Sequence, residues 1–434
     1  MIKKAVAFVL CFMLCGCYDN EEPNDIAFVT AVGIDRSKQN KENYDFTFQI
    51  AKPTQISGGA SEEGGKGGDI IQNITVEAPT VYAGIETANF IMSKTLSLSH
   101  IKLFVFSEEI SREGIADLTE TMSRSEEIRP NVYLAVAKES AKEYLESVKP
   151  SAEINPAKYY QAKFDKESFG GIPKSTNNEF YFYQKTDEKN IVLPIAAVIK
   201  TPDKNEQSNN QSSDSKGGQS GLEKPKENED QKNAPMNETP FEYKIKNYTA
   251  GQVAISEENE SELMGMAIFS GDKMVGEMGS SETLMYNIIT NRFEYGYVTF
   301  KSSKTEIPIT ILLQRTKKTK IDYDKETETA HITLFLDGEF VSLPSDYITE
   351  KDTKAFEEEI ETAICESFEM FMKRLQTEFN SDIVGIGSSA KGEFLTFDEF
   401  KKYNWTEKFP QINIKFNTDF VIERTGLTIR TEEQ

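Results

Sequence analysis

The stretch from Thr353 to Phe379, TKAFEEEIETAICESFEMFMKRLQTEF, carries the clearest structural pattern in the chain. Its apolar residues recur every three or four positions, which places them on one face of an α-helix. These residues are Phe356, Ile360, Ile364, Phe368, Phe371, Leu375 and Phe379. Acidic residues fill much of the opposite face, and acids in a first turn suit the helix dipole. We predict one long helix whose apolar stripe packs into a core, with docking into a partner's groove as the alternative.

Strand-like and helical segments alternate through the rest of the chain. In the N-terminal half we predict strands at 26–35, 44–51, 70–77, 101–106 and 132–137 and helices at 113–122 and 141–148. Another helix follows Pro79, with an apolar face made by Val81, Ile85, Ala88, Met92 and Leu96. The C-terminal half is predicted to hold a hairpin around Ser270-Gly271-Asp272, a helix at 281–289, and strands at 296–302, 308–314, 319–323, 331–336, 412–416 and 420–422. The fold class is therefore α+β, multidomain, with mixed sheets packed against helices.

A polar segment divides the chain. Between residues 200 and 240 the aliphatic and thioether side chains are Leu222, Ala234 and Met236 alone, amid Asn, Gln, Ser, Gly, Pro and charged residues. Such a composition buries too little apolar surface to offset the entropy of ordering. We therefore predict a disordered linker at 200–240 between an N-terminal region, 17–199, and a C-terminal region, 241–434, with a further division near 295.

The overall charge narrows the class of partner. The 434 residues include 49 Lys and Arg against 71 Asp and Glu, a formal net charge of −22. This acidity disfavours binding to phosphate backbones, so we expect no nucleic-acid partner. The two histidines, His100 and His331, lie in strand-like apolar runs and are interpreted as structural residues.

Motifs for catalysis or cofactor binding are not found. The Gly-rich run 58–68 lacks the Gly-Lys-Ser/Thr ending of a phosphate-binding loop, and Gly385-Ile386-Gly387-Ser388-Ser389 is interpreted as a helix exit and turn. No Gly-x-Ser-x-Gly, Cys-x-x-Cys or His-Glu-x-x-His sequence occurs. We assign no catalytic residue, no metal ligand and no cofactor, and we expect no enzyme activity.

The first seventeen residues have the layout of a bacterial lipoprotein signal. Basic Lys3 and Lys4 precede the apolar run AVAFVLCFML (5–14), which is shorter than the ~20 residues of a membrane span. Leu14-Cys15-Gly16-Cys17 then matches a lipobox, although Cys15 stands where Ala, Ser or Thr is commoner. We predict a signal peptide at 1–16, a diacylglyceryl anchor on Cys17 and no transmembrane span in the mature chain. An ordinary secretory signal is the alternative. Cys365 would remain as a buried small residue without a disulfide partner.

Four stretches, in this order, resemble the Ger(x)C family of germination lipoproteins. The first runs from Cys17 into the strand ending Gly33-Ile34-Asp35, and the second from Ser99 to Glu108, followed by Gly114-Ile115 and Arg124 to Arg129. The third is the hairpin 265–276 with Glu282-Thr283 after it. The fourth is the long helix ending in 380–387, followed by Trp405 and Phe409-Pro410. Tyr18 departs from the family, which usually has Trp there.

The resemblance implies a three-domain α+β protein, lipid-anchored on the outer face of the cytoplasmic membrane, which in a dormant spore is the inner spore membrane. It implies the C subunit of a nutrient germinant receptor, with two integral-membrane partners, the A and B subunits. Family members take part in the response to small nutrients that releases ions and dipicolinate. Direct nutrient binding by this subunit is left open.

Two other functions fit the same N-terminal signal. A solute-binding lipoprotein of a transporter would also have an acidic ectodomain, but it would have two similar lobes joined by hinge strands. A secreted hydrolase using carboxylates would rest on the abundance of Asp and Glu alone.

Overall fold

The computed structural model describes residues 25–52, 70–150, 155–165, 170–199, 247–252, 260–301, 308–342 and 350–424. Cys17, the Gly-rich run 58–68 and the segment 200–240 lie outside these residues. None of the helices in the described ranges is long and apolar enough to cross a membrane.

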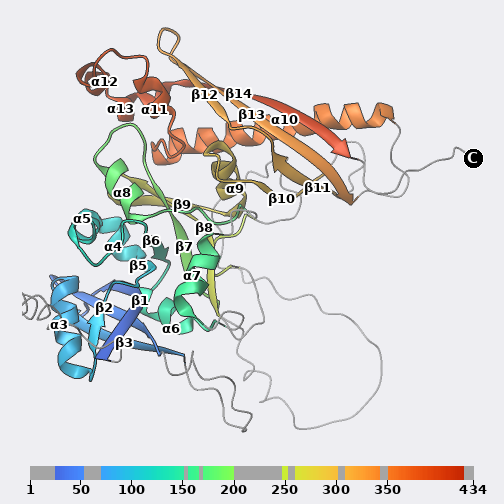
Figure 1. Ribbon diagram of the computed structural model, residues 1–434. Helices are drawn as coiled ribbons and strands as arrows, with labels where there is room; N and C mark the ends of the chain where they lie inside the picture. Colours follow the sequence, from blue (N-terminus) through green and yellow to red (C-terminus); the bar gives the residue numbers. More distant parts are fainter. Residues whose placement is uncertain are drawn as a thin grey trace, which may run out of the picture.

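Nine strands of the described chain form the first sheet, eight of them in the order β3-β2-β1-β5-β6-β7-β8-β9 (Figure 1). The ninth, β4, pairs with the start of β1. Its centre, β1-β5-β6-β7, is parallel, and antiparallel strands flank it on both sides. The strands are β1 (Ile26–Arg36), β2 (Tyr44–Ala51), β3 (Ile71–Ala78), β4 (Thr95–Ser97), β5 (Leu103–Ser107), β6 (Tyr133–Ala137), β7 (Val192–Val198), β8 (Ser261–Ser270) and β9 (Lys273–Met278). Because β7 pairs with β8, this sheet contains strands from both sides of the polar segment.

Helices cover both faces of this sheet. One apolar core lies under α3 (Val81–Ile91), α4 (Glu108–Glu113), α5 (Ala116–Arg124) and α8 (Asn177–Gln184). The core on the other face includes residues of α6 (Ala141–Ser147) and α7 (Pro156–Phe164). The parallel strands are therefore buried on both sides, as expected for β-strands linked by helical crossovers.

The second sheet has five strands in the described chain: β10 (Tyr295–Lys301), β11 (Pro308–Arg315), β12 (Lys320–Asp324), β13 (Thr329–Ser342) and β14 (Asn413–Arg424). The long strand β13 pairs with β11 and β12 and runs parallel to β14. One face of this sheet is covered by α10 (Glu350–Arg374), which continues as a π-helical turn, Leu375–Phe379. Figure 1 shows α10 lying along the sheet.

The apolar stripe of the long helix packs into the core, as predicted. Six of its seven residues are buried against the second sheet, from Phe356 to Leu375. The seventh, Phe379, lies over Gly276 of β9, where a β-carbon on Gly276 would come within 2.2 Å of the ring. The same core continues through α9 (Ser280–Ile289) to β7, β8 and β9, so one apolar core joins the two sheets.

The α+β class is confirmed, and several details differ from the predictions. The segments 412–416 and 420–422 form one continuous strand, β14, because its parallel hydrogen bonding to β13 passes through the polar residues between them. Cys365 is only partly buried, with its sulfur 3.3 Å from the hydroxyl of Thr418. Both histidines have exposed side chains: His331 on β13, and His100 before β5, where its ring contacts Phe28. The domain boundaries remain a prediction.

Candidate functional site

A polar cleft of about 270 Å³ lies where the two sheets meet. Its walls come from the α8–β7 loop, the β8–β9 turn, the end of the long helix, and the segment of α13 (Trp405–Lys408) and the short helix Phe409–Gln411. We call it the junction cleft; it is lined by Gln184, Thr186, Asp187, Lys189, Asn190, Ser270, Gly271, Asn380, Asp382, Trp405, Thr406 and Phe409. Its volume lies just below the usual range for small-molecule sites, roughly 300–1,000 Å³.

Asp382 is the central side chain of the junction cleft. Its buried carboxylate accepts hydrogen bonds from the backbone nitrogens of Gly385 (2.8 Å), Ile386 (3.2 Å) and Gly387 (2.8 Å). It also accepts from Nε1 of Trp405, at 3.0 Å. Burial raises the pKa of Asp382, against these four hydrogen bonds, which lower it. The carboxylate occupies the run of N–H groups that a phosphate would need. The segment itself begins helix α11 (Ile386–Lys391), with Gly385 as its N-cap, so the predicted helix exit and turn is wrong.

The same segment is joined to the α8–β7 loop and to β8 of the first sheet. The backbone nitrogen of Asn190 donates to the carbonyl of Asp382 (2.7 Å), and Oγ of Ser381 donates to the carbonyl of Phe269 (2.8 Å). Lys391, on α11 (Ile386–Lys391), pairs with Glu188 at 3.1 Å. Gly387 lies so close to the carbonyl of Glu188 that a β-carbon would come within 2.3 Å of it. Contacts of this kind fix the two halves in one orientation.

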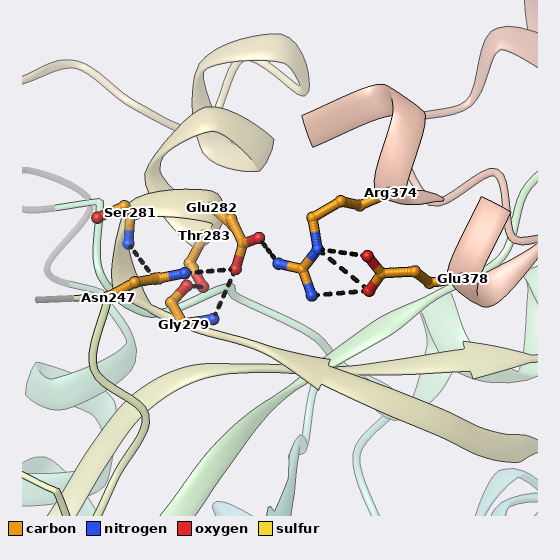
Figure 2. A network of polar contacts seen from close by, with 7 residues as sticks. All are labelled: Asn247, Gly279, Ser281, Glu282, Thr283, Arg374 and Glu378. Atoms are coloured by element: carbon orange, nitrogen blue, oxygen red, sulfur yellow. Dashed lines mark hydrogen bonds and ion pairs between the residues drawn. The ribbon is translucent and has the colours of Figure 1, made fainter. Parts of the chain in front are cut away.

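A second polar network lies beside the junction, at the start of α9 (Figure 2). The carboxylate of Glu282 accepts from the backbone nitrogen of Gly279 (3.0 Å) and from the amide of Asn247 (2.7 Å), and it pairs with Arg374 of α10. Arg374 also makes a bidentate pair with Glu378, from Nε to one carboxylate oxygen and from a terminal nitrogen to the other. Glu282 therefore both caps α9 and connects it to the long helix.

Replacing Glu282 with Gln should cost about 1–3 kcal/mol of stability, because its side chain is only 8% exposed and its charged partner would stay in place. Glu378→Gln provides the control: that carboxylate is 48% exposed, and a surface pair at this spacing contributes about 0.3–0.5 kcal/mol. Urea denaturation of each variant measures the difference. Equal losses for both variants would show that Glu282 does not connect the two helices.

The acidic face of the long helix also has structural partners. Glu357 accepts from the backbone nitrogen of Ile422 (2.9 Å), and Glu361 accepts from that of Phe420 (3.2 Å). These carboxylates cover N–H groups of β14 that the sheet leaves unpaired, which protects an edge strand from pairing with another chain.

The four stretches that resemble the Ger(x)C family make contacts that hold the fold together or line the junction cleft. Asp35, at the end of the first stretch, caps α6 by accepting from the nitrogens of Ala141 (2.8 Å) and Lys142 (2.9 Å). In the second stretch, the nitrogen of Ile115 donates to the carbonyl of Asp272 in the β8–β9 turn (3.1 Å). The third and fourth stretches line the junction cleft. Cys17 lies outside the described residues.

Two family models match the chain in these same regions. The family described as "Spore germination protein N-terminal domain" matches residues 19–198, and "Spore germination B3/ GerAC like, C-terminal" matches residues 264–426. The chain belongs to the Ger(x)C family of germination proteins. Neither description names a catalytic activity, and no three His, Cys, Asp or Glu residues of the described chain are placed to hold a metal ion.

Named relatives support the Ger(x)C assignment. Spore germination protein KC of Bacillus subtilis is 27% identical over 204 residues, which are 45% of this chain and 48% of that protein, so the match spans about half of the relative. Spore germination protein GerQC of Bacillus cereus is 21% identical over 98% of this chain and 100% of its own length. The crystal structure of the GerBC protein covers 90% of this chain and 96% of that chain, with a TM-score of 0.50 at 12% identity, which shows a shared fold.

The sequence pattern did not single out Asp382, Gly387 or Glu282 as interacting residues. Asp382 stands three positions before Gly385, and Trp405 is the chain's one tryptophan, but neither spacing indicates that the two side chains meet. Their pairing depends on how the segment after α10 folds back.

Proposed function

We propose that the chain is the lipid-anchored C subunit of a nutrient germinant receptor. It would act with two integral-membrane subunits, A and B, to trigger spore germination. The main support for this proposal is that family models of the Ger(x)C family match both halves of the chain. The lipobox-like segment ending at Cys17 supports an anchor on the outer face of the cytoplasmic membrane, the inner spore membrane of the dormant spore.

The junction supports a role in assembly and signalling. One apolar core and two hydrogen bonds, from Asn190 to the carbonyl of Asp382 and from Ser381 to the carbonyl of Phe269, join the two sheets. A subunit built this way would present its surfaces to A and B in a set orientation. We assign it no catalytic residue, cofactor or metal.

A solute-binding lipoprotein of a transporter is less well supported. That class has two similar lobes, whereas this chain combines a mixed parallel and antiparallel nine-stranded sheet with a five-stranded sheet of different order within its described residues. Calorimetry with the isolated ectodomain separates the two functions, because tight binding of one nutrient would favour the transporter component.

Germination of spores that lack the gene tests the proposal. Such spores should lose the response to at least one nutrient, and the wild-type gene should restore it. The Cys17→Ala variant should fail to restore it and should leave the membrane fraction, because the acylated thiol is gone. Cys365→Ala is the matched control and should stay with the membrane. Normal germination with every nutrient, or an unchanged membrane fraction for Cys17→Ala, would contradict the proposal.

A further inference from the structure

The last turn of α3 exposes two large apolar side chains. Phe90 is 90% exposed and Ile91 is 70% exposed, although most large apolar side chains of the described chain are buried. The buried face of α3, which includes Val81 and Ile85, points into the sheet. Phe90 and Ile91 therefore serve no internal core, and exposed apolar groups that lie together mark contact with another surface.

This turn lies beside the point where the described chain begins. Strand β4, which follows α3, runs parallel to the start of β1, with Thr95 opposite Ile26. The side chain of Asn89 accepts from the backbone nitrogen of Leu96 at 2.8 Å, which ties the end of α3 to β4. The exposed pair is thus attached to the strand that the N-terminal segment enters.

The length of that segment limits how far this region can be from a membrane anchor. Cys17 precedes Asp25 by eight positions. Eight residues span at most about 26–29 Å even when fully extended. An acylated Cys17 would keep the start of β1, and with it the end of α3, near the lipid surface.

We propose that Phe90 and Ile91 insert into the headgroup and acyl boundary of the membrane as a second, non-covalent contact. This proposal rests on the lipid anchor of the proposed function. Aromatic and aliphatic side chains at a helix end partition into this boundary, and exposed Lys94 is placed to meet lipid phosphates. Two side chains bind weakly alone, but the anchor makes their insertion intramolecular and raises their effective concentration.

The contact also sets an orientation for the subunit. The α3 end would face the bilayer, and α11, α12 (Phe397–Tyr403) and α13, which lie at the opposite end of the molecule in Figure 1, would face away from it. Another exposed apolar residue, Leu395, is 96% exposed and lies between α11 and α12. The two helices on either side of it lie at the opposite end of the molecule from α3 in Figure 1, so it provides a matched control.

Site-specific fluorescence tests the insertion. The full chain carries Cys365→Ser together with either Phe90→Cys or Leu395→Cys. An environment-sensitive fluorophore is attached to the introduced cysteine, and the labelled chain is mixed with vesicles of phosphatidylcholine and phosphatidylglycerol. Because both positions are exposed, neither substitution removes a core contact. In the vesicle-bound fraction, the probe at position 90 should shift to the blue, and nitroxide lipids should quench it roughly threefold more than the probe at position 395.

Flotation of the vesicles separates this test from the test of the anchor. If the chain does not float with the vesicles, the lipid anchor is contradicted. The insertion is then tested alone, with labelled chains that carry a histidine tag in place of residues 1–17 and bind to nickel-chelating lipid. A vesicle-bound chain whose position 90 stays in water overturns the proposal. Protection of position 90 that requires the A and B subunits also overturns it, in favour of a protein contact.

Discussion

Replacing Gly387 with Ala is expected to lower the stability of the junction by about 2–4 kcal/mol. The added β-carbon would come within 2.3 Å of the carbonyl oxygen of Glu188 and 2.5 Å of Nε1 of Trp405. The carbonyl of Glu188 belongs to the backbone and the ring of Trp405 is buried, so neither group can move to relieve the clash. Alanine is favoured over glycine within a helix by up to ~1 kcal/mol, which is too little to offset this clash.

Denaturation followed by tryptophan fluorescence measures the effect, because Trp405 is the chain's one tryptophan and lies at the junction. Gly171→Ala is the matched control, because a β-carbon added at Gly171 would have no heavy atom within 4 Å outside its chain neighbours. The control should change stability by less than about 0.5 kcal/mol. Equal midpoints for the two variants would mean that Gly387 does not hold the halves together.

Replacing Asp382 with Asn should cost a similar amount, about 2–4 kcal/mol. The carboxylate accepts four hydrogen bonds, whereas the amide offers one acceptor oxygen and turns its own NH₂ group toward donors. The substitution therefore leaves buried N–H groups unsatisfied at nearly constant volume.

The fluorescence of Trp405 should report this loss directly, as a change in the emission maximum of the native variant, since its Nε1 would lose its carboxylate partner. Asp419→Asn, at an exposed position of β14, is the control and should keep both the emission and the midpoint of the wild-type chain. A native spectrum and midpoint for Asp382→Asn would show that the four hydrogen bonds do not stabilise the turn.

Much of the local structure could be predicted, since helices and strands follow from the spacing of apolar residues along the chain. The stripe from Phe356 to Leu375 predicted both a long helix and its buried face. The polar residues 417–419 led to the prediction of two separate strands. One continuous strand forms there, because backbone hydrogen bonding does not depend on the side chains. Glu357 and Glu361 are among the acidic residues opposite the apolar stripe, and nothing in their spacing indicates that their carboxylates bond to β14.

The sequence by itself determined the family, through the order of four stretches, and the α+β composition of the fold. Local periodicity and motif order are properties of the linear chain, so they can be recognised without coordinates. The tertiary structure alone decided that Asp382 meets Trp405 and that Gly387 meets Glu188, far earlier in the chain. Those contacts arise because the two sheets pack on one core. The residues lie far apart along the chain, so their positions in the sequence do not indicate that they meet.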